Sequence, residues 1–254
     1  MRIGLFVIGD EILSGKRQDR HLARVIELLG SRGMGLDWAR FIGDDLERIA
    51  AAIREARRAG DLVLSCGGIG ATPDDCTRQA AAAAFAQPLC PHPEGVALIE
   101  AEYGERAHPH RVLMAHFPRG AGLIPNPVNR VAGFHVEHQH FVPGFPDMAW
   151  PMIEWVLDAR YPQLRRADPP VEFAARVLGS AAESDLLETM EAVLGRYPGV
   201  KLSSLPFRGD GVRPRHIELG ILGPSAQAAQ AFEFLLQRLQ DEPRVRLELI
   251  RSPP

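Results

Sequence analysis

Two short segments combine glycines with acidic side chains in a pattern that could bind a phosphate and a metal ion. Residues 9–15 read GDEILSG, and residues 67–77 read GGIGATPDDCT. Glycines let a phosphate approach the backbone N–H groups closely, and carboxylate oxygens are ligands for hard cations. The second segment is the stronger signal, because closely spaced glycines just past an apolar run are typical of a loop whose N–H groups surround an anion.

The same segments also have structural explanations, which the residues alone leave open. The second segment could be a tight strand-to-helix turn, with Thr72 as the N-cap and Pro73 at the first helical position. Asp74 and Asp75 could then only cap that helix, near the positive end of its dipole. Glu11 could be a solvated side chain.

Two familiar phosphate motifs are excluded. A dinucleotide fingerprint requires G-x-G-x-x-G, but Pro73 stands where the third glycine would be. A P-loop requires G-x-x-x-x-G-K-[ST], but the spacing from Gly9 to Gly15 is one residue too long, and Arg17 follows Lys16. Neither a Rossmann dehydrogenase nor a Walker-type NTPase is predicted.

The elements around the two segments alternate between strand and helix. The apolar runs 3–8 and 62–66, each ended by a glycine, are typical of strands buried on both faces. Helices are predicted over residues 22–29 and from Asp44, which resembles a capping box with Glu47. This alternation predicts an α/β fold with a mostly parallel, doubly wound sheet. Ligands bind where such strands end, so both segments should lie at one edge of the sheet.

A predicted hairpin carries three histidines. Residues 134–136 and 140–142 should pair as short strands, with His138 in the turn. His135, His138 and His140 have the composition of a metal site, but a solvated hairpin is the preferred interpretation. Cys66 and Cys76 are interpreted as small core residues rather than nucleophiles.

A change of pattern indicates two domains. Residues 161–170 are rich in arginine and proline, and beyond them the order is strand, helix, strand, strand, helix, strand. We therefore predict an α/β domain over residues 1–165 and a small α+β domain over residues 170–254, with the βαββαβ order of a split βαβ sandwich.

Bulk properties exclude several classes of protein. The 254 residues are 46% hydrophobic and 24% charged, as in ordinary globular proteins. The net charge of -3 gives no support to nucleic-acid binding, and no apolar stretch approaches the roughly 18 residues of a membrane-spanning helix. The first strand leaves no room for a secretory signal, and the three cysteines form no C-x-x-C pair. A cytoplasmic protein with reduced thiols is predicted.

Four motifs, in order, resemble the molybdenum-cofactor-biosynthesis (MoaB/Mog, molybdopterin-binding) fold family, and specifically its branch of competence/damage-inducible protein A (CinA). That branch carries G-D-E-[IL]-L-x-G and G-G-[LI]-G-x-T-x-D-D-x-T, which match residues 9–15 and 67–77. Residues 125–128 and 143–148 are similar to the family's P-N-P-x and P-G-x-P-x-x-M segments. The resemblance covers about residues 1–160, and the remainder is similar to the small domain that follows in the family.

The resemblance implies a site for molybdopterin or an adenine nucleotide, with a divalent cation such as Mg, Mn or Co. The family's essential aspartates match Asp75 and either Asp44 or Asp45. We expect Asp10, Glu11 and Asp75 to hold the cation and to act in catalysis. The other expected ligand contacts are Gly9, Ser14, Gly67, Gly68, Gly70, Thr72, Asp44, Asp74, Thr77, Pro143 and Gly144.

The chain also departs from the family pattern. Asp19, Arg20 and His21 stand where relatives commonly have D-T-N, and Ala71 stands where the second loop has a proline. The missing Thr–Asn pair should alter contacts to the base or sugar of the ligand, and Arg20 should favour a more anionic one.

Three functions are compatible with the resemblance, since all three need the same phosphate site. The leading hypothesis is a metal-dependent nucleotide pyrophosphatase, a hydrolase of the ADP-ribose type. The alternatives are a non-catalytic molybdopterin-binding protein and a molybdopterin adenylyltransferase. A homodimer or trimer is expected. Amide hydrolysis is not expected, because nothing remains for the deamidase domain of full-length relatives.

Overall fold

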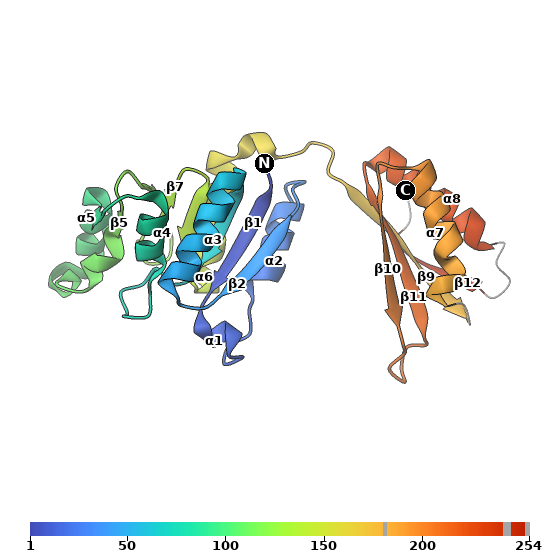
Figure 1. Ribbon diagram of the computed structural model, residues 1–254, viewed down its shortest axis with the longest axis horizontal. Helices are drawn as coiled ribbons and strands as arrows, with labels where there is room; N and C mark the ends of the chain where they lie inside the picture. Colours follow the sequence, from blue (N-terminus) through green and yellow to red (C-terminus); the bar gives the residue numbers. More distant parts are fainter. Residues whose placement is uncertain (180–181, 241–244, 252–254) are drawn as a thin grey trace. The chain divides into compact units, whose positions relative to one another are not determined.

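The computed structural model describes residues 1–179, 182–240 and 245–251 (Figure 1). The chain forms two compact units, Met1–Arg165 and Arg166–Pro254. Each unit has its own hydrophobic core, and the glycine-and-acid segments both lie in the first. Within the described residues, no helix has the length and apolar character needed to span a membrane.

The first unit is built on a six-stranded sheet whose first four strands run parallel. In spatial order they are β2 (Trp38–Ile42), β1 (Ile3–Ile8), β3 (Leu62–Cys66), β8 (Gln139–Val142), β7 (Gly133–Val136) and β6 (Gly122–Ile124). Strands β7 and β6 pair antiparallel to their neighbours. The predicted mostly parallel α/β sheet is confirmed, as is the pairing of β7 with β8.

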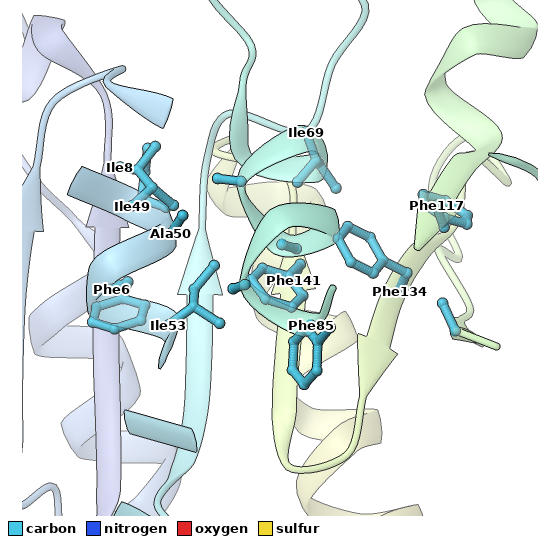
Figure 2. Close-up of a cluster of buried hydrophobic side chains, with 14 of the residues drawn as sticks. Phe6, Ile8, Ile49, Ala50, Ile53, Ile69, Phe85, Phe117, Phe134 and Phe141 are labelled. Atoms are coloured by element: carbon cyan, nitrogen blue, oxygen red, sulfur yellow. The ribbon is translucent and has the colours of Figure 1, made fainter. Parts of the chain in front are cut away.

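Strand β1 shows why a continuous apolar run is needed at the centre of this sheet. Its side chains alternate between two cores, with Leu5 and Val7 in one and Phe6 and Ile8 in the other. The first core includes residues of α2 (His21–Gly30) and α6 (Pro146–Trp155), and the second those of α3 (Leu46–Ala59) and α4 (Thr77–Phe85). Figure 2 shows the second core. Helices therefore cover both faces of the sheet.

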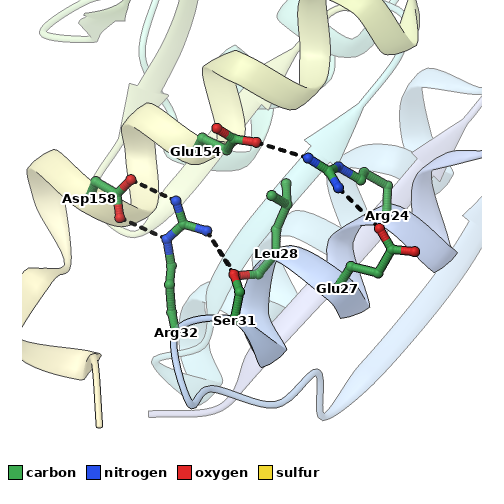
Figure 3. Close-up of polar contacts among 7 residues, drawn as sticks. All are labelled: Arg24, Glu27, Leu28, Ser31, Arg32, Glu154 and Asp158. Carbon is green, nitrogen blue, oxygen red and sulfur yellow. Dashed lines mark hydrogen bonds and ion pairs between the residues drawn. The ribbon is translucent and has the colours of Figure 1, made fainter. Parts of the chain in front are cut away.

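Ion pairs join α2 and the turn after it to α6 and the helical turn that continues it (Figure 3). Arg32 donates two hydrogen bonds to Asp158, with N···O distances of 2.7 and 2.6 Å, and Arg24 donates one to Glu154 at 3.2 Å. Asp158 lies in a π-helical turn, Val156–Arg160, that continues α6. The Asp158 carboxylate raises the pKa of Arg32, so this buried guanidinium is stabilised as a cation.

A small insertion follows α4. It consists of β4 (Leu89–Pro91), α5 (Pro93–Tyr103), two 3₁₀ turns and β5 (His116–Pro118), and β4 pairs antiparallel with β5. Phe117 of β5 stacks on Phe134 at 4.7 Å between ring centroids, and Phe134 stacks on Phe141 at 4.5 Å. This aromatic column ties the insertion to the central sheet.

The expectation of a solvated histidine hairpin is wrong for His140, although His138 is exposed in the turn as expected. His140 is fully buried on β8, where its Nδ1 donates to the carbonyl of Val63 at 3.1 Å. The Tyr161 hydroxyl lies 3.3 Å from Nε2 of His140 and 3.0 Å from Nδ1 of His138. Burial lowers the pKa of His140 to about 3, so the ring is neutral and acts as a structural hydrogen-bonding group.

In its described residues, the second unit is a four-stranded antiparallel sheet with two α-helices. Its spatial order is β10 (Lys201–Phe207), β11 (His216–Gly223), β9 (Val171–Gly179) and β12 (Val245–Arg251). Helices α7 (Leu187–Arg196) and α8 (Ser225–Gln240) pack on it and contribute to one core. The predicted βαββαβ order is confirmed.

The aromatic column gives a test of the first core. We expect Phe141→Ala to lower the free energy of unfolding by about 3–5 kcal/mol, because it leaves a cavity in a fully buried stack. Chemical denaturation of the full chain measures this loss. Phe41→Ala, at a side chain that is 41% exposed, is the matched control and should cost under about 1 kcal/mol. Equal losses in the two variants would contradict the described packing.

Candidate functional site

The loops that follow the parallel strands meet at one edge of the sheet. The N–H of Gly9, after β1, donates to Ile42 at the end of β2, and the N–H of Gly67, after β3, donates to Val142 at the end of β8, both at 3.0 Å. A Cβ on Gly67 would lie 2.1 Å from the Ile8 carbonyl oxygen, so only glycine fits there. The loop after β8 joins this group, because a Cβ on Gly144 would lie 3.4 Å from Gly67.

The second segment presents a row of free backbone donors. Gly67 and Gly68 adopt φ values of +109° and +68°, which L-residues rarely adopt. In the part of the chain that the structure describes, the N–H groups of residues 68–71 have no hydrogen-bond acceptor. Successive backbone N–H groups in a turn are the donors from which an anion-binding nest is built. We call residues 68–71 the amide nest.

The segment that follows the nest folds differently from the expectation. Thr72 is not a helix N-cap: α4 begins at Thr77, and its N-cap is Cys76. The Thr77 N–H donates to the Gly68 carbonyl at 3.0 Å, and its hydroxyl donates to the Gly67 carbonyl at 3.1 Å. These two bonds fix the glycine loop to the first residue of α4, so the helix begins at Thr77 and no earlier.

Asp75 closes a turn of its own instead of capping a helix. Its Oδ2 accepts from the Thr72 N–H at 3.1 Å and from the Thr72 hydroxyl, while its own N–H donates to the Thr72 carbonyl at 3.0 Å. The carboxylate lies over the nest, since a Cβ on Gly70 would be 2.4 Å from Oδ2. Asp74, next to it, is exposed.

Asp10 and Asp44 form a reciprocal pair between the loops after β1 and β2. The Asp10 N–H donates to Oδ2 of Asp44 at 2.9 Å, and the Asp44 N–H donates to Oδ1 of Asp10 at 3.2 Å. Asp44 is therefore not the cap of α3; Asp45 is, accepting from the Arg48 N–H at 2.9 Å. The first segment is also no open loop, because residues Asp10–Leu13 form one helical turn, α1.

Negative charge is concentrated around this pair. Partial burial raises the pKa of Asp44, and the charges of Asp10, Glu11 and Asp74 raise it further. The Glu11 carboxylate lies over the loop backbone, since a Cβ on Gly9 would be 2.5 Å from its Oε2. A cation or a proton at this position would relieve the repulsion.

The expected three-carboxylate metal cage is not formed. Among the described residues, no three His, Cys, Asp or Glu side chains are placed to hold a metal ion together. Asp10 pairs with Asp44, whereas Asp75 is bound to the Thr72 turn. A cation at this edge would therefore need ligands from a bound phosphate or from water, in addition to those from the protein.

The remaining expected contacts take different positions. Ser14 is exposed at the C-cap of α1, and Pro143 and Gly144 lie in the loop after β8. Arg20 lies with its guanidinium carbon 5.5 Å from the centroid of the Trp150 ring. Asp19 precedes Arg20, the N-cap residue of α2, and its side chain accepts from the His21 N–H at 2.9 Å.

Two residues near the site were not expected from the sequence. His21 is buried, and its Nε2 lies 3.1 Å from the Gly144 carbonyl oxygen, so it links α2 to the loop after β8. Arg78 is buried under the nest, and its Nη2 donates to the Gly70 carbonyl at 2.6 Å. Its spacing from the buried Ala81, Ala82 and Phe85 follows the helical period and would have placed it on the inner face of α4.

Comparison with known proteins agrees with this architecture. The model of a family described as a probable molybdopterin binding domain matches residues 4–166. A CinA-like protein of Syntrophotalea carbinolica is 33% identical over 187 residues, covering 70% of this chain and 45% of the relative. A protein of Escherichia coli K12 named NMN amidohydrolase-like protein YfaY is 30% identical over 249 residues, which cover 92% of this chain and 58% of the relative. The chain thus spans about half the length of the curated relatives it matches.

A solved structure gives the same result for the fold. The crystal structure of the protein CinA with unknown function, from Thermoplasma acidophilum, aligns with a TM-score of 0.57 at 29% identity. The alignment covers 63% of this chain and 98% of that one. Together with the family match over residues 4–166, it shows that this chain belongs to the molybdopterin-binding-domain family, in its CinA-like branch.

Proposed function

We propose that the first unit binds a phosphate-bearing nucleotide or pterin at this edge of the sheet. We further propose that, with a divalent cation, it hydrolyses the diphosphate bond of an ADP-ribose-type nucleotide. The observation that carries the proposal is the amide nest: consecutive N–H groups without acceptors, beside the Asp10–Asp44 pair. The nest and the pair adjoin because Gly67 packs on the end of β1.

The amide nest and the neighbouring carboxylates favour ligands of opposite charge. For this reason the proposal includes a cation. The nest attracts a phosphate, whereas the carboxylates of Asp10, Asp44 and Glu11 repel it. Two like charges about 4 Å apart repel by about 4 kcal/mol at an effective dielectric constant near 20. A divalent cation between carboxylate and phosphate converts that repulsion into attraction.

The donor set fits a cation that the protein and the ligand share. Mg²⁺ is commonly held by one or two carboxylates together with substrate phosphates and water, which agrees with the absence of a three-residue cage among the described residues. Asp10 and Asp44 would supply the carboxylates. When bound, such a cation neutralises charge on the transferring phosphoryl group and lowers the pKa of an attacking water. The reciprocal Asp10–Asp44 hydrogen bonds keep both carboxylates oriented without it.

One observation favours a binding protein without catalysis. Asp75, expected to be catalytic, is engaged with the Thr72 turn, and hydrolysis would need it only if that turn opened. Tight pterin binding that survives chelation, with no hydrolysis of ADP-ribose, would support this alternative. ATP-dependent release of pyrophosphate in the presence of molybdopterin would instead support adenylyl transfer. The homo-oligomer and the cytoplasmic location stay predictions.

Hydrolysis of ADP-ribose by the full chain with Mg²⁺, Mn²⁺ or Co²⁺ tests the proposal. We expect Asp10→Asn to reduce turnover by about 100-fold or more, because it removes a charge that stabilises the transition state through the cation. Asp45→Asn is the matched control: it keeps an N-cap for α3 and should retain activity. Activity that persists in a metal chelator, or in Asp10→Asn, would refute the metal-dependent mechanism.

The raised pKa of Asp44 predicts how stability depends on pH. The folded chain holds a proton on Asp44 more tightly than the unfolded chain does, so stability falls as the pH rises above the ordinary aspartate pKa. Asp44→Asn removes the charge and keeps an oxygen to accept from Asp10. It should raise Tm at neutral pH by roughly 1–3 °C, a small effect because solvent screens the site.

The same substitution should have no effect at about pH 3, where the aspartate is already protonated. Thermal unfolding of the wild type and the variant at both pH values measures the difference. If Asp44→Asn lowered Tm equally at both pH values, the repulsion among these carboxylates would not be a significant cost to the fold.

A further inference from the structure

Arg78 is a buried guanidinium with an unusual set of partners. It is 4% exposed and is the second residue of α4. Its Nη2 donates to the Gly70 carbonyl at 2.6 Å, and its Nη1 donates to the carbonyls of Leu113 and, at 3.4 Å, His116. Its Nε is buried without a hydrogen-bond partner. All of its described acceptors are neutral.

Arg32 shows what a compensated buried arginine looks like in this chain. Arg32 is 8% exposed, and Asp158 accepts two hydrogen bonds from it (Figure 3). No carboxylate within the described residues lies at ion-pair distance from Arg78. Burial lowers the pKa of Arg78, and the charge of Asp75 opposes this only partly. A buried charge without a counter-charge is costly to the fold.

The position of Arg78 connects its charge to the amide nest. A peptide unit is planar and trans, so the carbonyl of Gly70 and the N–H of Ala71 point in opposite directions. Because Arg78 binds that carbonyl, the Ala71 N–H points away from Arg78, and it is one of the donors without an acceptor. Arg78 thus orients and polarises a donor of the nest from the opposite side of the loop.

We propose that Arg78 is a positioning residue whose unpaired charge is balanced by the ligand, and that the nest therefore selects diphosphates over neutral or singly charged groups. The proposal rests on the proposed function, because it assumes that an anion binds the nest. It adds to that function the charge class of the ligand and a residue that sets it. Asp75, whose carboxylate lies over Gly70, is the nearby anion whose charge offsets that of Arg78 only in part.

Calorimetric titration of the full chain with inorganic pyrophosphate, with and without Mg²⁺, tests the role of Arg78. We expect Arg78→Met to weaken pyrophosphate binding at least about tenfold, as for the loss of a desolvated charge. Arg78→Lys should recover part of the affinity, because it keeps the charge and loses the forked hydrogen bonds. Arg32→Met is the matched control: it should lower Tm and leave pyrophosphate affinity unchanged.

The outcomes separate this inference from the proposed function. If the wild type binds pyrophosphate and Arg78→Met binds it equally well, the inference is overturned and the phosphate site stands. If the wild type binds neither pyrophosphate nor ADP-ribose, the proposed function fails first. If Arg78→Lys were as weak as Arg78→Met, the charge would not be the cause, and the role of Arg78 would be structural only.

If Arg78→Met does not fold, an NMR measurement on the wild type tests the role of Arg78 instead. The ¹⁵Nε resonance of Arg78, assigned by its loss in Arg78→Lys, should shift when pyrophosphate saturates the protein, whereas that of Arg32 should not. Saturation without any shift at Arg78 would overturn the inference.

Discussion

The site depends on the level alignment of four parallel strands. In the described register, Ile8 at the end of β1 pairs with Ile42 at the end of β2, and Cys66 at the end of β3 pairs with Val142 at the end of β8. Residues distant in sequence therefore begin their loops at the same height. Because parallel strands all point the same way, their polar loop residues collect at one edge and the apolar side chains fill the two cores.

This arrangement places groups that favour an anion close to groups that favour a cation. The amide nest and the buried Arg78 favour an anion, while the carboxylates of Asp10 and Asp44 favour a cation. Neither set is fully compensated by the protein, as the raised pKa of Asp44 and the unpaired Arg78 indicate. A ligand that carries both a diphosphate and a metal ion would satisfy both sets at once. Uncompensated groups of this kind are expected at functional sites rather than in structural cores.

Local sequence patterns were sufficient for the framework of the fold. Glycine-ended apolar runs predicted β1 and β3, and the alternation of strand and helix predicted the parallel sheet. The start of α4 could not be read in this way, because the N–H and the hydroxyl of Thr77 donate to the carbonyls of Gly68 and Gly67 in the glycine loop, and these bonds delay the helix. Thr72 and Pro73 have the right types for a helix start, but Asp75 uses Thr72 for a separate turn.

Contacts between distant segments account for the other differences. Asp44 was expected to cap a helix, yet its partner is Asp10, 34 residues away, and only the register of β1 and β2 brings them together. The burial of His140 follows from the neighbouring strand β3 and from Tyr161, which no local period reveals. The spacing of Arg78 from the apolar residues of α4 is enough to place it on the buried face of its helix. Its contact with the Gly70 carbonyl could not be predicted in this way, because it depends on how the glycine loop folds.

The most direct test of the account is a backbone amide NMR titration of the full chain with ADP-ribose and Mg²⁺. If the amide nest holds the phosphate, the N–H resonances of residues 68–71 should show the largest downfield shifts, since hydrogen bonding to a charged oxygen deshields these protons. Binding that left those resonances in place, with the main shifts elsewhere on the chain, would contradict the central claim.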